Sequence, residues 1–118
     1  MGEHERYAAM AVDRLKDVVG VLEILLFGSV SRGEARDDSD IDLAVIFSEN
    51  VTRMFTTNSL SEFPIVVHSD IKKIKDEFEK IGSPRLDISL YYKDEYDAVV
   101  ELGRDVLNDV GVVKYVAD

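Results

Sequence analysis

The sequence contains no cysteine and only two prolines among its 118 residues. Without thiols, the chain has no disulfide framework, no thiolate zinc site and no cysteine nucleophile. It also lacks a long hydrophobic run: the most apolar early segment, residues 18–27, is too short to span a bilayer and is interrupted by Glu23. We therefore expect a soluble, cytoplasmic protein that does not engage a membrane.

Basic residues are scarce, since 14 Lys and Arg stand against 24 Asp and Glu, for a net charge of −10. A protein this acidic lacks the positive surface that holds a nucleic-acid backbone, so direct nucleic-acid binding is not expected. The chain is nevertheless 46% hydrophobic and 32% charged, a balance that allows a buried core. Its length predicts a single domain over residues 1–118.

Hydrophobic periodicity predicts an α/β (α+β) fold, in which a small mixed β-sheet has helices packed on it. The predicted helices cover residues 3–19, 70–81 and 94–108, with a further short helix opened by the capping-box sequence of residues 31–34. Strands are predicted over residues 21–27, 41–47, 63–68, 86–92 and 110–116. Residues 37–40 are a predicted turn and residues 48–62 a predicted loop. Gly20 and residues 82–84 should end helices, and Ser69 should begin one.

Residues 25–46 carry most of the chemical information, and two familiar motifs fail to explain them. The spacing of Gly28 and Gly33 fits a P-loop, but Glu34 stands where that motif needs the lysine that contacts phosphate. An EF-hand calcium loop placed over the following aspartates needs glycine at its sixth position, where Leu43 stands in a strand-like run.

A two-metal nucleotide site fits the same residues better. Asp40 and Asp42 are two positions apart at a strand, so their side chains project from one face. Two adjacent carboxylates repel each other unless cations lie between them, and Mg²⁺ prefers such oxygen ligands. Upstream, Gly28 and Ser29 lie where a strand meets a helix N-terminus, which can hold phosphate oxygens. Taken separately, Gly28-Ser29 would be better explained as a helix cap, and Asp40 and Asp42 as a solvated strand end.

The combination is more specific than its parts. Gly28-Ser29, ten intervening residues and Asp40-Ile41-Asp42 reproduce the G-S-x10-D-x-D signature of the polymerase β-type nucleotidyltransferases. The fuller pattern, with Arg32-Gly33 and the run Ser39–Val45, resembles the minimal nucleotidyltransferases of prokaryotes. This resemblance implies a polymerase β-like palm fold.

The resemblance also implies a third carboxylate on a later strand, for which Asp87 is the candidate. It is the lone acid of an apolar run and faces away from Leu86 and Ile88. By resemblance, Asp40, Asp42 and Asp87 are the catalytic residues and hold two Mg²⁺ ions, with Asp87 favouring deprotonation of the acceptor. Gly28 and Ser29 would bind the triphosphate of ATP or another nucleoside triphosphate.

Two arginines are further candidates for phosphate binding. Arg32 lies inside the signature, although pairing with Glu34 or Asp37 would explain it nearly as well. Arg85 precedes the third acid and is the weaker candidate, because exposed arginines are common beside strands.

The remaining polar and aromatic residues have structural interpretations. We expect both histidines, His4 and His68, to be solvated. The tyrosines at positions 91, 92 and 96 should pack in and around the core. The lysines at positions 72, 73 and 75 should form the wet face of a helix.

The predicted activity is Mg²⁺-dependent transfer of a nucleoside monophosphate, most simply AMP, to an acceptor hydroxyl. The resemblance implies a HEPN-domain partner protein of a toxin–antitoxin pair, with a tyrosine as acceptor, and a second copy of the chain is another source of an acceptor site. Two alternatives remain open at this point. One is a non-catalytic antitoxin that neutralises its partner by contact, and the other is a standalone enzyme acting on a small molecule.

Overall fold

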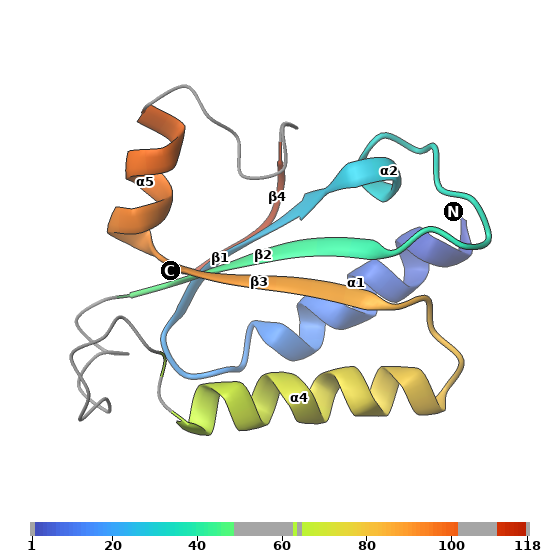
Figure 1. Ribbon diagram of the computed structural model, residues 1–118, viewed down its shortest axis with the longest axis horizontal. Helices are drawn as coiled ribbons and strands as arrows, with labels where there is room; N and C mark the ends of the chain where they lie inside the picture. The colour runs from blue at the N-terminus through green and yellow to red at the C-terminus, as the bar shows by residue number, and fades with distance from the viewer. Residues whose placement is uncertain (1, 49–62, 64, 102–110, 118) are drawn as a thin grey trace.

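The computed structural model describes residues 2–48, 63, 65–101 and 111–117. In chain order, its elements are α1 (Glu3–Leu15), β1 (Val21–Phe27), α2 (Gly28–Ser31), β2 (Ile41–Phe47), α4 (Ile65–Lys80), β3 (Leu86–Tyr92), α5 (Lys93–Glu101) and β4 (Val112–Val116) (Figure 1). The four strands form one sheet of order β3-β2-β1-β4. Strands β2 and β3 are parallel and the other pairs antiparallel, which confirms the predicted mixed α/β fold.

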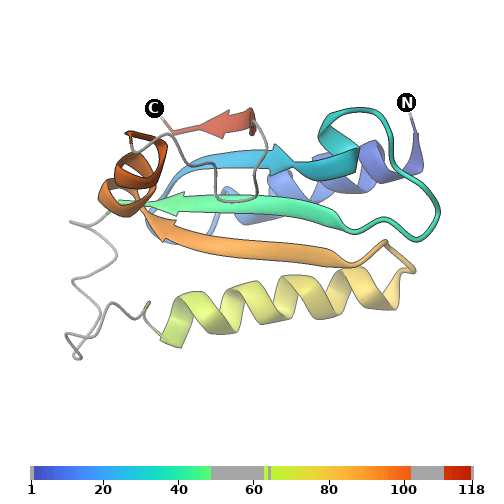
Figure 2. The same cartoon turned by 45° about the horizontal axis from the view of Figure 1, so that its top comes forward.

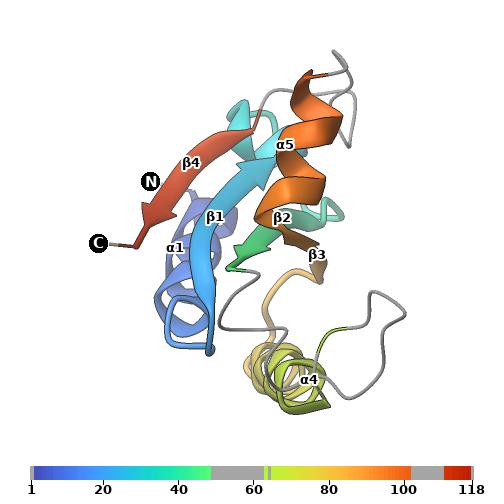
Figure 3. The same cartoon turned by 90° about the vertical axis from the view of Figure 1, so that its left-hand side faces the viewer.

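Helices cover the two faces of the sheet unequally. Figures 2 and 3 show α1 and α4 along one face, while α5 stands on the other face at the end of the sheet away from α2. The larger core lies under α1 and α4. A smaller one, made of Leu25, Phe27, Ala44 and Ile46, lies on the α5 side. In the part of the chain that the structure describes, no helix is long and apolar enough to cross a membrane.

The predicted bounds of β1, β2 and β3 are confirmed residue for residue. The central strand β2 is buried on both faces after its second residue, with Leu43 and Val45 in the larger core and Ala44 and Ile46 in the smaller one. Burial on both faces explains why its sequence is a nearly continuous apolar run. The exception is Asp42, which is half-buried.

The predicted strand over residues 63–68 is wrong, because α4 begins at Ile65. Val67 is buried together with Ile71, Ile74 and Phe78, so the apolar stripe of the helix extends one turn further back than expected. Ser69 consequently lies inside the helix rather than at its cap. The predicted loop over residues 48–62 lies outside the described residues except for Ser48.

Two further expectations near the first strand need correction. Helix α1 ends at Leu15 instead of residue 19, although Gly20 still closes the turn that follows it, with φ +85°. The predicted capping box at residues 31–34 does not form. The helix begins three residues earlier, at Gly28, and the Ser31 hydroxyl donates to the Gly28 carbonyl at 2.7 Å.

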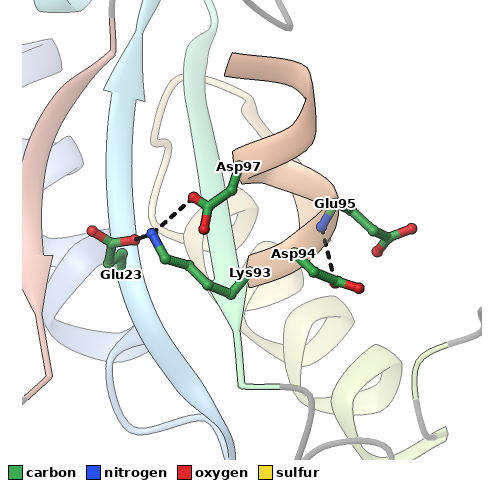
Figure 4. Close-up of polar contacts among 5 residues, drawn as sticks. All are labelled: Glu23, Lys93, Asp94, Glu95 and Asp97. Atoms are coloured by element: carbon green, nitrogen blue, oxygen red, sulfur yellow. Dashed lines mark hydrogen bonds and ion pairs between the residues drawn. The ribbon is translucent and has the colours of Figure 1, made fainter. Parts of the chain in front are cut away.

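Helix α5 is attached to the sheet by a cluster of ion pairs and by contact between two tyrosine rings. Lys93 Nζ lies 3.0 Å from Glu23 Oε2 on β1 and 3.0 Å from Asp97 Oδ1 on the next turn (Figure 4). These hydrogen bonds, first to Asp97 and then to Glu23, raise the pKa of Lys93. The rings of Tyr91 and Tyr96 are in contact, with centroids 6.0 Å apart, so the predicted tyrosine packing is confirmed.

The ends of the last two elements are only partly described. Residues 102–108 of the predicted helix and residue 110 of the predicted strand lie outside the described residues. Within them, α5 begins one residue earlier than predicted and β4 covers residues 112–116 of the predicted strand.

Gly111, just before β4, packs against the ring of the fully buried Phe27. A Cβ atom at this position would lie 2.5–3.0 Å from three ring carbons, so we expect Gly111→Ala to lower the free energy of unfolding by about 1–3 kcal/mol, the usual cost of overpacking a core. Chemical denaturation would measure it. Gly2→Ala is the control, because its Cβ would meet only the flexible end of Glu5, and at this N-cap position the change should cost only about 0.5 kcal/mol. Equal stability of the two variants would contradict the packing argument.

Candidate active site

The parallel pairing of β2 with β3 brings together two of the predicted carboxylates. Asp42 is the Cα partner of Asp87, each as the second residue of its strand, so the two side chains project from the same face. Asp40 comes just before β2, two residues from Asp42. Asp87 is exposed, whereas Asp40 and Asp42 are half-buried. The sheet face that carries Asp42 and Asp87 is called the carboxylate face below.

The electrostatics of this group centre on Asp42. Burial raises its pKa, and the negative charges of Asp87 and then Asp40 add to the rise, as does a side-chain hydrogen bond with Asp87. The carboxylates are therefore close enough to oppose each other's ionisation. Such an arrangement destabilises the fold slightly and is typical of functional sites.

The turn between β1 and α2 lies directly against this group. Phe27 pairs with Asp42 across β1 and β2, which places Gly28 beside the Asp42 carboxylate. Gly28 has φ +72°, and a Cβ atom built there would collide with Asp42 Oδ2. Glycine is thus required here both by the backbone conformation and by the space that the carboxylate occupies.

The next residues close the turn into a compact unit. The backbone N–H of Glu34 donates to the Ser29 carbonyl at 2.8 Å, and that of Arg32 donates to the Gly28 carbonyl at 3.3 Å. Ser29 itself is half-buried in the first turn of α2. The first turn of a helix carries a partial positive charge, which favours an anionic ligand.

The two arginine candidates differ in their surroundings. Arg32 Nε lies 3.1 Å from Glu34 Oε1 in an exposed ion pair, the alternative that the sequence left open. Exposed pairs of this kind contribute little to stability. The Arg85 side chain is exposed, and its backbone carbonyl accepts a hydrogen bond from Ile41 N–H at 2.8 Å.

The prediction that both histidines are solvated is half wrong. His68 is exposed as expected, but His4 is buried, with 8% of its surface accessible. The burial of His4 could have been predicted from helical spacing, because His4 shares one face of α1 with the buried residues Tyr7, Ala8, Ala11 and Leu15. The lysines at positions 72, 73 and 75 are exposed, which confirms the wet-face prediction.

The carboxylates suit a divalent cation by their chemistry. Asp42 and Asp87 offer hard oxygen ligands, and a nearby cation would offset the repulsion that adds to the effect of burial in raising the Asp42 pKa. Across residues 2–48, 63, 65–101 and 111–117, no three His, Cys, Asp or Glu side chains are gathered tightly enough to hold a metal ion. The three carboxylates are thus suitable ligands by type, and Asp42 lies near both Asp87 and Asp40, but they are not drawn together into one metal-binding cluster.

A cavity of about 640 Å³ lies elsewhere, between α1, α2 and β4. Its lining combines apolar side chains, among them Ala8, Val12, Leu26 and Val30, with the charged residues Glu5, Asp13, Lys16 and Lys114. Leu26 alternates with Phe27 along β1 and belongs to the larger core, so this cavity is on the opposite side of the sheet from the carboxylate face.

Comparison with known proteins agrees with the geometry. Protein adenylyltransferase MntA of Thermococcus cleftensis is 54% identical over 35 residues, which are 30% of this chain and 35% of that protein. A Methanocaldococcus jannaschii protein, assigned as a protein adenylyltransferase, is 56% identical over 36 residues, or 30% of this chain and 36% of that one. The chain thus spans about a third of the length of the curated relatives it matches.

A solved structure and a family match cover much more of the chain. The crystal structure of a Sulfolobus solfataricus protein, assigned as a nucleotidyltransferase, superposes with a TM-score of 0.53 over 96% of this chain and 80% of that one. Its sequence identity is 19%, so it shows a shared fold. The nucleotidyltransferase domain family matches residues 9–107. With most of its length matched, the chain belongs to the nucleotidyltransferase domain family.

Proposed function

We propose that this protein transfers a nucleoside monophosphate, most simply AMP from ATP, to a hydroxyl group of an acceptor. The acceptor oxygen forms a bond to the α-phosphorus, and the bond between that phosphorus and the pyrophosphate oxygen breaks. The hydroxyl proton is lost to a base or to water, and pyrophosphate leaves. Catalysis of such a reaction consists mainly of positioning the groups and stabilising negative charge.

The observation that carries this proposal is the pairing of Asp42 with Asp87 directly beside the Gly28 turn. It combines a carboxylate pair with a backbone segment suited to phosphate oxygens, within the residues that the nucleotidyltransferase domain family matches. Asp40, Asp42 and Asp87 would hold two Mg²⁺ ions, which supply positive charge to the triphosphate and to the attacking and leaving oxygens.

The chain's own residues have separate roles in this proposal. Backbone N–H groups at Gly28 and Ser29, together with the Ser29 hydroxyl, orient the triphosphate. Arg32 binds a phosphate oxygen after leaving Glu34. Asp87 is the most exposed of the three carboxylates and can be reached by the acceptor, where it favours loss of the hydroxyl proton.

For the acceptor we propose a protein hydroxyl, namely a tyrosine of a HEPN-type toxin that this chain neutralises as its antitoxin. The names of the two curated relatives, both protein adenylyltransferases, support a protein acceptor. Coexpression of the chain with such a partner should yield a copurifying pair in which the partner's intact mass rises by one or more AMP units. An unmodified partner would contradict this assignment and leave the nucleotide site to be judged separately.

The nucleotide site itself can be tested without an acceptor. We expect Mg·ATP, titrated calorimetrically, to bind the wild type and to lose all measurable binding in Asp40→Asn/Asp42→Asn. The matched control is Asp37→Asn/Asp38→Asn, which removes two exposed aspartates from the same loop and therefore the same charge. Equal binding by the wild type and both double variants would refute the site, as would a wild type that binds no nucleoside triphosphate.

A further inference from the structure

His4 is the one buried polar or charged side chain within the part of the chain that the structure describes. Its Nε2 atom lies 3.0 Å from the backbone carbonyl oxygen of Ser39, 35 residues away in the sequence. A carbonyl oxygen can only accept, so Nε2 carries the hydrogen and donates it. Burying a polar ring is costly unless it is hydrogen-bonded, and this bond supplies the compensation.

The bond joins two segments that meet at the end of the sheet. In Figures 1 and 2, the connection from α2 to β2 passes beside the N-terminal end of α1. His4 thus ties the start of the chain to the residue immediately before Asp40. Asp40 lies in no helix or strand, so its position depends on how firmly this connection is held.

Further hydrogen bonds hold the residues on either side of Asp40. Arg36 N–H donates to Ser39 Oγ at 2.9 Å, and Ser39 N–H donates to the Arg36 carbonyl at 3.0 Å. On the other side, Ile41 N–H donates to the Arg85 carbonyl at 2.8 Å. Asp40 is therefore held between two anchored neighbours, and the Ser39 carbonyl is anchored by His4.

We propose that His4 is a positioning residue that fixes the Asp40 carboxylate through the Ser39 carbonyl. The inference rests on the proposed function, in which Asp40 is a ligand of the catalytic metal ions. Groups that orient a metal ligand, without touching the metal, commonly change metal affinity by 10-fold or more when they are removed. Loss of the His4 donor should therefore weaken metal binding more than it weakens the fold.

The test compares His4→Leu, which removes the donor, with His4→Gln, whose amide nitrogen can still reach the carbonyl. His68→Leu is the matched control, because it removes the other, exposed histidine. Amide hydrogen exchange should show about a tenfold loss of protection at Ser39 in His4→Leu, with protection restored in His4→Gln and unchanged in His68→Leu. If His4→Leu does not fold, His4→Asn takes its place, since its shorter side chain also loses the bond.

The second measurement is a binding titration with Mn²⁺ as the probe, carried out at a fixed ATP concentration and well below the melting temperature. We expect the Mn²⁺ concentration at half-maximal binding to rise about tenfold in His4→Leu and to keep its wild-type value in His68→Leu. A lower melting temperature with an unchanged Mn²⁺ midpoint would show a merely structural role and overturn the inference. Unchanged hydrogen exchange at Ser39 would also overturn it.

The two measurements separate this inference from the proposed function. Hydrogen exchange requires neither metal nor nucleotide, so it decides whether His4 holds the segment before Asp40 even in an inactive protein. A wild type that binds no Mn·ATP would refute the proposed function, and the positioning of Asp40 would then be accepted or rejected on the exchange data.

Discussion

Gly28→Ala should strongly slow nucleotidyl transfer while leaving most of the fold intact. The substitution acts twice: it forces alanine into a backbone conformation with φ +72°, and it drives a Cβ atom into Asp42 Oδ2. The Asp42 carboxylate, which lies between Gly28 on the β1 side and Asp87 on the β3 side, must then leave its position. Since displacing one charged group in a preorganised site costs about two to three orders of magnitude in rate, we expect at least a hundredfold loss of turnover.

Gly33→Ala supplies the control for the backbone contribution. Gly33 has φ +70° in the segment that follows α2, but a Cβ atom there would meet nothing within 4 Å. Both variants should lose about 1–2 kcal/mol of stability from left-handed strain, measurable by denaturation. Only Gly28→Ala should lose turnover by the larger factor. Equal activity of the two variants would show that the contact with Asp42 is irrelevant to catalysis.

The strands of this fold could be predicted from the sequence because burial dictates their composition. In β2 only Asp42 interrupts the apolar run, so the polar interruption marks the site as clearly as the run marks the strand. The fixed spacing from Gly28 to Asp42 spans one turn and one connection between neighbouring strands. Because this spacing depends on local geometry, the sequence alone was enough to predict that Gly28 and Asp42 belong to one site.

The errors arose where tertiary packing decides between two locally acceptable structures. The β-branched run at residues 65–67 favours a strand by propensity, yet burial of Val67 beside Ile71 makes it the first turn of α4. At residues 31–34 a capping box was plausible, but the position of Gly28 against Asp42 starts the helix earlier. Pairing of Asp42 with Asp87 required the sheet order, which the sequence does not state.

Asp42→Asn should make the metal-free protein more stable and, at the same time, inactive. The wild-type carboxylate is half-buried, and burial together with the charges of Asp87 and Asp40 raises its pKa. An ionised Asp42 therefore costs stability at neutral pH. Asparagine removes that cost and can still donate a hydrogen bond to Asp87. We expect thermal unfolding at pH 7 to shift upward by a few degrees, and turnover to fall about a thousandfold or more because the proposed metal ligand is lost.

The stability difference between the wild type and Asp42→Asn should depend on pH. A folded-state pKa above the unfolded value means that the wild type is penalised at high pH and relieved as Asp42 becomes protonated. The stability advantage of Asp42→Asn should thus be largest near pH 7 and vanish below the ordinary aspartate pKa of 3.8. Asp76→Asn is the control, because the pKa of Asp76 is shifted in the opposite direction: a hydrogen bond from Lys72 lowers it. Removing the Asp76 carboxylate should therefore not stabilise the protein at pH 7.

Saturating Mg·ATP should then reverse the order of stability between the wild type and Asp42→Asn. Ligand that binds the native state raises its melting temperature by mass action, and only the wild type retains the full set of carboxylates to bind it. The residue that destabilises the empty protein would thus stabilise the loaded one, as expected of a side chain retained for binding rather than for folding. An Asp42→Asn variant that is less stable than the wild type without ligand at pH 7 would contradict this account.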